Sequence, residues 1–122
     1  MPRPRTTLPQ DAISDARGVL DHDMSERALQ AAVMRQAKLL GWHCFHTWNS
    51  QHSEGGFPDL LLLKGERCVV AELKREDKKP TTKQAIWLLE FETAGIEAYW
   101  WRPSNWSSGE IEAVLRGEEA ER

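Results

Sequence analysis

The sequence predicts an α/β domain in which a mixed β-sheet is flanked by helices, in the order α-β-β-β-α-β-α. Three observations support this fold class. Apolar residues recur at helical spacing over 24–40 and again over 81–94, and a glycine follows each segment. Two short apolar runs, 60–63 and 67–74, are separated by a glycine-containing turn, which is typical of an antiparallel hairpin. A further β-forming segment, 96–101, follows the second helix.

The helices are predicted from pairs of residues that can satisfy the free N–H groups of a first helical turn. Three such pairs, spaced by three residues, precede helical segments: Asp23 with Glu26, Thr81 with Gln84, and Ser107 with Glu110. The last helix is expected to end at Arg116. Residues 1–22 contain three prolines and no sustained apolar period, so we expect a flexible arm there. The folded domain is therefore expected over 23–117, followed by an acidic tail at 118–122.

The strands are predicted from short β-forming segments. Residues 42–48 are rich in aromatic side chains, and a polar loop follows them. The wholly apolar run 60–63 is typical of a strand that is buried on both faces. Residues 67–74 are expected to return antiparallel to it.

Composition limits the function. The 122 residues suffice for one domain with a buried core, and no apolar stretch approaches the ~20 residues of a membrane span. Cys44 and Cys68 are expected to be reduced thiols in the cytoplasm. The net charge of -3 argues against a protein covered in basic residues, but a local basic patch can still bind phosphate.

Three charged residues adjoin the predicted hairpin. Glu72 and Lys74 are two residues apart on one strand and therefore project from the same face. The hairpin spacing places Asp59 nearly opposite Glu72. Pro58 presents Asp59 rigidly, and Gly56 permits a close approach of backbone or substrate.

This arrangement predicts a metal-dependent reaction. Two adjacent carboxylates, Asp59 and Glu72, repel each other unless a cation lies between them, and Mg²⁺ or Mn²⁺ prefers such oxygen ligands. Lys74 can orient or deprotonate a water molecule, or neutralise charge that develops on phosphorus. Together these groups favour phosphodiester hydrolysis. The alternative is a structural ion-pair network in which Lys74 pairs with both carboxylates.

The pattern Gly56-x-Pro58-Asp59, then Glu72-Leu73-Lys74, then Gln84, resembles the VRR-NUC branch of the PD-(D/E)XK nucleases, over roughly residues 24–103. The resemblance implies a restriction-endonuclease-like core and a divalent metal held by Asp59, Glu72 and the Leu73 carbonyl. It also implies catalytic assistance from Lys74, contact between Glu26 and the metal through water, and a place for Gln84 near the active site. Glu26 and Gln84 each retain the alternative role of a helix-capping residue.

Two groups of residues are expected to contact DNA. In the segment after the hairpin, five basic residues oppose Glu76 and Asp77, which leaves a surplus of three positive charges: Lys74, Arg75, Lys78, Lys79 and Lys83. A solvated loop can have the same composition. The second group flanks the polar loop: His46, Trp48, Asn49 and Ser50.

The sequence therefore predicts a Mg²⁺- or Mn²⁺-dependent DNA endonuclease, with junction or branched DNA as a possible substrate class. The family resemblance implies a small phage or bacterial protein in the cytoplasm of the cell or infected host. A homodimer is expected, because cutting both strands requires two sites related by a two-fold axis. Two alternatives remain: a non-catalytic DNA-binding or regulatory module with the nuclease fold, and a structural interaction protein.

Overall fold

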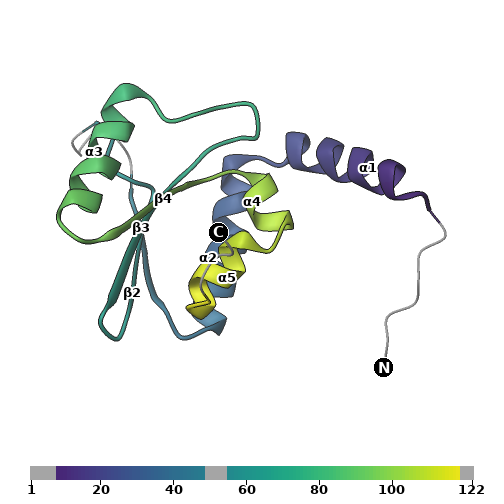
Figure 1. Ribbon diagram of the computed structural model, residues 1–122. Helices are drawn as coiled ribbons and strands as arrows, with labels where there is room; N and C mark the ends of the chain where they lie inside the picture. Colours follow the sequence, from purple (N-terminus) through teal and green to yellow (C-terminus); the bar gives the residue numbers. More distant parts are fainter. Residues whose placement is uncertain (1–7, 49–54, 119–122) are drawn as a thin grey trace.

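The computed structural model describes residues 8–48 and 55–118 (Figure 1). Five helices are present in this part of the chain: α1 (Gln10–Asp23), α2 (Glu26–Leu39), α3 (Thr82–Thr93), α4 (Pro103–Ser107) and α5 (Glu110–Arg116). Its four strands are β1 (His43–His46), β2 (Leu60–Lys64), β3 (Arg67–Leu73) and β4 (Glu97–Trp101). None of these helices combines the length and apolar character needed to cross a membrane.

The strands form one mixed sheet in the order β1-β2-β3-β4. β2 pairs antiparallel with both β1 and β3, whereas β4 lies parallel to β3 after the chain crosses over through α3. The pairing of Lys64 with Arg67 confirms the predicted hairpin turn. Helices cover both sides of the sheet, with α3 on one side and α2, α4 and α5 on the other (Figure 1). The predicted class is confirmed, and the arrangement is consistent with a restriction-endonuclease-like core.

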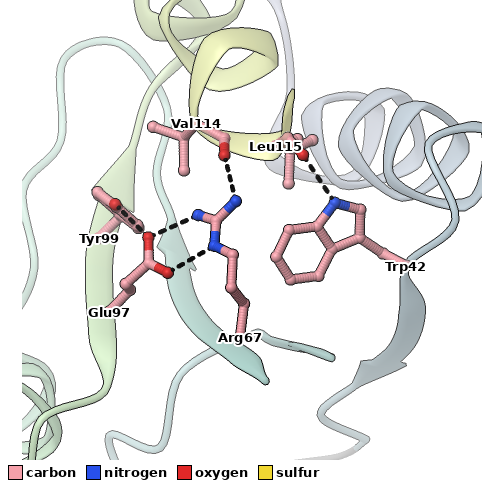
Figure 2. Close-up of polar contacts among 6 residues, drawn as sticks. All are labelled: Trp42, Arg67, Glu97, Tyr99, Val114 and Leu115. Atoms are coloured by element: carbon pink, nitrogen blue, oxygen red, sulfur yellow. Dashed lines mark hydrogen bonds and ion pairs between the residues drawn. The ribbon is translucent and has the colours of Figure 1, made fainter. Parts of the chain in front are cut away.

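The main core lies between the sheet and helices α2 and α5. Alternate residues of β2 and β3 point into it, together with Trp101 and apolar residues of the two helices, such as Leu29 and Ile111. Trp42 closes the core near its edge, and its indole Nε1 donates to the Leu115 carbonyl oxygen at 3.0 Å (Figure 2). Because one face of each strand packs in this core, only the opposite face of the sheet can carry side chains that bind a ligand.

The opposite face of the sheet is only partly covered. Helix α3 packs on β3 and β4, and the β1–β2 half of this face remains accessible. Leu63 is 45% exposed there, and Phe45 on β1 is exposed as well. The prediction that β2 is buried on both faces is therefore wrong, because α3 does not extend over β1 and β2.

The N-terminal part differs from the prediction of a flexible arm. Residues Gln10–Asp23 form helix α1, which has no buried residue and extends away from the sheet (Figure 1). Apolar residues do recur at helical spacing here, at positions 13, 16 and 20, and the prediction of a flexible arm missed this pattern. The capping pair at Asp23 is also wrong, because Asp23 ends α1. Ser25 is the cap of α2 instead, and its hydroxyl accepts from the Ala28 N–H at 3.0 Å.

Deleting residues 1–22 is expected to leave the domain folded. Helix α1 contacts α4, where the Ser107 hydroxyl donates to Asp21 Oδ2 at 3.0 Å, but it contributes no buried side chain. We expect Tm to fall by less than about 4 °C, which corresponds to under about 1 kcal/mol. Thermal melting of the truncated chain measures this. A much larger loss would show that the segment packs against something, such as a second copy of the chain.

The C-terminal helix is also divided differently from the prediction. Pro103–Ser107 forms the short helix α4, and Gly109, with φ +85°, separates it from α5. The predicted capping pair of Ser107 with Glu110 is absent, and the Glu110 N–H instead bonds to the Ser108 hydroxyl at 3.3 Å. The predicted last helix corresponds to α5, which ends at Arg116 as expected, whereas α4 was not predicted.

A polar cluster ties the starts of β3 and β4 to α5 (Figure 2). Arg67 donates from Nε and Nη2 to the two oxygens of Glu97, at 2.9 and 2.7 Å, and from Nη1 to the Val114 carbonyl oxygen at 3.0 Å. The Tyr99 hydroxyl donates to the same carboxylate at 2.8 Å. These bonds lower the pKa of Glu97. Because β3 and β4 are parallel, the cluster lies at the opposite end of the sheet from Glu72.

Candidate active site

The hairpin brings Asp59 and Glu72 together. Leu60 pairs with Ala71, so one step further along the hairpin Asp59 lies opposite Glu72. Asp59 reaches across the end of the hairpin, where its Oδ2 accepts from the Leu73 N–H at 2.8 Å. The sequence-based expectation that these two carboxylates face each other therefore agrees with the register.

Glu72 is a buried carboxylate. Its residue is only 2% exposed, and it is the one charged residue among the buried residues of the described chain. Its Oε1 has no hydrogen-bond partner, and its Oε2 lies 3.6 Å from Lys74 Nζ. A buried charge with one unpaired oxygen is costly. A bound cation would satisfy this oxygen.

The pKa of Glu72 is raised to about 8. Burial is the largest cause, followed by the negative charge of Asp59, while the Lys74 ammonium acts in the opposite direction. Without a ligand, Glu72 therefore holds a proton near neutral pH, which relieves its repulsion with Asp59. A cation bound between the two carboxylates would replace that proton.

Lys74 forms one of the two ion pairs of the structural alternative. Its ammonium pairs with Glu72 at 3.6 Å, and the described residues show no ion pair between Lys74 and Asp59. The Lys74 N–H bonds to the Trp101 carbonyl oxygen on β4 at 2.9 Å. Successive strand residues point their N–H and C=O groups to opposite neighbours, so the Leu73 carbonyl points toward β2 and Asp59.

Glu26 lies at the first position of α2, with its side chain exposed. Its carboxylate contributes to the raised pKa of Glu72, as the weakest of the causes. Glu26 does not lie close enough to complete a three-ligand set, since no three His, Cys, Asp or Glu side chains in residues 8–48 and 55–118 gather around a common point.

Gln84 has a structural task. Its N–H donates to the Thr81 hydroxyl at 3.2 Å, and its Oε1 accepts from the Thr81 N–H at 2.9 Å. The predicted capping box at the start of α3 is confirmed. Only the amide nitrogen of the Gln84 side chain is left for another contact.

The segment before Asp59 is held against α3 by contacts that the sequence did not predict. Phe57 packs edge-on against Trp87 and Phe91, with ring centroids 5.1 and 5.8 Å away, and the Trp87 indole donates to the Gly55 carbonyl oxygen at 3.2 Å. No sequence signal links Phe57 to Trp87 and Phe91, because Phe57 precedes β2 whereas the other two lie on α3. They fix the direction from which Asp59 enters the site.

Thr47 supports Asp59 from the other side. Its N–H donates to the Asp59 carbonyl oxygen at 2.7 Å, and its hydroxyl donates to the Pro58 carbonyl oxygen. Thr47 directly follows β1, so this edge strand also positions the candidate site. Sequence reasoning missed Thr47, since a threonine beside a loop carries no distinctive signal.

Gly56 is expected to tolerate no side chain. Its φ is +92°, and an added Cβ would lie 2.8 Å from the backbone carbon of Lys83 and 2.9 Å from its oxygen. Gly56→Ala therefore combines unfavourable φ with a clash against the backbone of α3, and we expect a loss of roughly 3 kcal/mol in the free energy of unfolding. Gly65→Ala is the matched control, because Gly65 also has positive φ but open space around it. It should cost about 1 kcal/mol. Equal losses in urea denaturation would contradict the close approach.

The predicted DNA-contacting residues differ in their exposure. Arg75, Lys78, Lys79 and Lys83 are exposed, and the Lys83 side chain passes beside Gly55. His46 is half-buried, and its ring lies 5.9 Å from that of the exposed Trp48. The predicted contacts at Asn49 and Ser50 lie outside the described residues.

Comparison with known proteins gives one partial similarity. Over 52 residues the chain is 42% identical to the Fanconi-associated nuclease 1 homolog of Caenorhabditis elegans, and the match covers 41% of this chain and 6% of that protein. The chain thus spans only a small fraction of this relative's length. No protein-family model matches the chain, and no solved structure matches it significantly. The chain is therefore similar, over less than half of its length, to a segment of a protein described as a nuclease.

Proposed function

We propose that the protein is a Mg²⁺- or Mn²⁺-dependent nuclease that hydrolyses phosphodiester bonds in DNA. The observation that carries this proposal is the buried Glu72 carboxylate, which faces Asp59 and has one oxygen without a partner. The partial similarity to a nuclease supports the same reaction class.

The donor set fits a hard divalent cation. Asp59, Glu72 and the Leu73 carbonyl would hold it, and Glu26 would contact it through water. Such ions are commonly bound by one or two carboxylates and keep several waters, so the lack of a third carboxylate is no obstacle. When bound, the ion polarises the scissile phosphate and lowers the pKa of a coordinated water.

Lys74 is positioned to orient a water molecule and to stabilise negative charge. Its ammonium lies beside Glu72 and is largely buried, with 13% of the side chain exposed, so its charge is little screened. In the proposed reaction Lys74 orients the attacking water and stabilises the negative charge that develops on the phosphate oxygens. Asp59 is kept in place by Thr47 and the Leu73 N–H, so its carboxylate needs no rearrangement.

Cleavage of a panel of DNA substrates tests the proposal. Duplex, single-stranded, flap and junction DNAs should be incubated with Mg²⁺, Mn²⁺ or a chelator. We expect cleavage with either metal and none with the chelator, and the preferred member of the panel defines the structural selectivity. DNA binding without cleavage under every condition would favour a non-catalytic DNA-binding module instead.

We also propose that the active form is a homodimer. A single domain of this size covers only a few base pairs, and two sites related by a two-fold axis would act on both strands. Light scattering at micromolar concentration, with and without DNA, is expected to return twice the chain mass. A monomer under both conditions would contradict the dimer without affecting the proposed chemistry.

A further inference from the structure

The two adjacent tryptophans of β4 have different environments. Trp101 is 1% exposed and lies in the main core, whereas Trp100 is 37% exposed on the opposite face of the sheet. The β3–β4 register pairs Trp100 with Glu72, so both side chains leave the same face from neighbouring strands. An accessible indole therefore lies one strand away from the candidate metal ligand.

Trp100 borders two cavities of about 380 Å³ each. The first lies between α3 and β4, and its apolar lining includes Pro80, Leu88 and Ala98. The second is lined by charged residues, among them Lys78 and Arg102. Because Lys79 and Trp100 line both cavities, the indole separates an apolar hollow from a charged one.

The charged cavity favours an anion. The Arg102 guanidinium lies over the Trp100 ring, with Cζ 4.9 Å from the ring centroid. Glu76 is already engaged, since its Oε1 accepts from the Ser104 N–H at 2.9 Å. The three cations of this lining, Lys78, Lys79 and Arg102, exceed its two carboxylates, Glu76 and Asp77, by one positive charge.

We propose that these two cavities form a subsite for an unpaired nucleotide of the DNA substrate. The base stacks on Trp100 in the apolar cavity, and the attached phosphate contacts Arg102 and Lys79. A ring flanked by cations matches the combination of flat base and phosphate, whereas an apolar peptide would gain nothing from the cationic side. In a continuous duplex the base faces are covered by their neighbours, so the subsite favours DNA with a single-stranded segment.

The subsite rests on the proposed function, because the strand it holds must pass the carboxylate pair. It also deepens that function, since it names a substrate class that a metal site alone does not specify. Trp100 and Arg102 were assigned no binding role on sequence grounds. In this proposal they are substrate-positioning residues that take no part in the chemical step.

The affinity for DNA, measured in the presence of a chelator so that no cleavage occurs, tests the subsite. Fluorescence anisotropy should compare labelled single-stranded and duplex oligonucleotides on the wild type, Trp100→Ala, Trp100→Phe and Arg102→Ala. We expect Trp100→Ala to weaken single-strand binding about 10-fold and duplex binding less than about 2-fold, with most of the loss restored in Trp100→Phe. Arg102→Ala should weaken binding and reduce the salt dependence by about one ion.

Phe45→Ala is the matched control, because it removes an exposed aromatic residue from β1, the edge strand opposite β4 in the sheet. It should leave both affinities unchanged. Thermal melting of each variant ensures that only folded protein is compared.

The outcomes separate the subsite from the proposed function. Equal losses for single-stranded and duplex DNA in Trp100→Ala, or no loss at all, would overturn the subsite even if the wild type cleaves DNA. A change in oligomeric state in Trp100→Ala, without a change in DNA affinity, would overturn it in favour of a subunit interface. Selective loss in a protein that never cleaves with Mn²⁺ would support the subsite and refute the nuclease.

Discussion

Glu72→Ala is expected to abolish cleavage while leaving the metal-free protein at least as stable as the wild type. The substitution removes a candidate metal ligand, and it also removes a buried carboxyl group that lacks a partner for one oxygen and that would repel Asp59 once ionised. Loss of an unsatisfied buried polar group can offset the packing lost with the side chain. Calorimetric titration with Mn²⁺ should show greatly weakened binding, and melting should show no loss of Tm.

Asp59 and Lys74 are expected to respond differently from Glu72. Asp59→Ala should abolish cleavage and also cost about 1–3 kcal/mol, because it leaves the Leu73 N–H without its acceptor. Asp59→Asn can keep that hydrogen bond and should recover most of the stability but no activity. Lys74→Ala should retain much of the metal affinity and slow cleavage by a factor on the order of 10² to 10⁴.

The structural alternative predicts another pattern for these variants. If the three residues served only as ion-pair partners, every substitution would lower stability, and Mn²⁺ would have no special effect on any of them. A wild type that binds no Mn²⁺, together with variants that are merely less stable, would therefore end the nuclease proposal.

The second large effect is a pH dependence of stability in the metal-free protein. The pKa of Glu72 is about 8 in the folded chain and near the ordinary value of 4.5 when unfolded. Because the folded value is the higher one, this group's contribution is fully present below about 4.5 and is lost as pH rises through about 8. We expect the free energy of unfolding to fall by on the order of a few kcal/mol across this interval.

Glu72→Gln is the matched control for this pH dependence. It keeps the size and hydrogen-bonding groups of the protonated side chain but cannot ionise. Urea denaturation at a series of pH values should give a nearly flat profile for Glu72→Gln over the same interval. Parallel slopes for the variant and the wild type would show that other groups cause the effect. Saturating Mn²⁺ should stabilise the wild type most at high pH, where the carboxylate is ionised.

Local patterns predicted the centre of this fold well. The run Leu60–Leu63, its glycine turn and the returning strand specify the hairpin, and the spacing from that turn places Asp59 opposite Glu72. Thr81 and Gln84 likewise specify their own capping box. These features depend on neighbours in the sequence or on the two-residue period of a strand, so one sequence suffices to predict them.

Features that depend on contacts between distant parts of the sequence could not be predicted from local patterns. Helix α1 buries no side chain, so its apolar residues at 13, 16 and 20 do not mark a face that packs on the sheet. Leu63 looked like a core residue, and its exposure follows from the position of α3 over the other half of the sheet. Thr47 and Trp87 position the Asp59 segment through contacts that join separate elements. The orientation of the site therefore depends on packing that the motif does not encode.

The hydrogen bond from the Leu73 N–H to Asp59 provides a built-in reporter of the site. The next amide, Lys74 N–H, bonds to the main chain of β4, so two consecutive amides are protected by different partners. Exchange of the Leu73 amide hydrogen with solvent deuterium will follow the state of a carboxylate, whereas exchange at Lys74 will follow the opening of the sheet. The ratio of the two rates gives a residue-level reading of site occupancy that requires no substrate and no turnover.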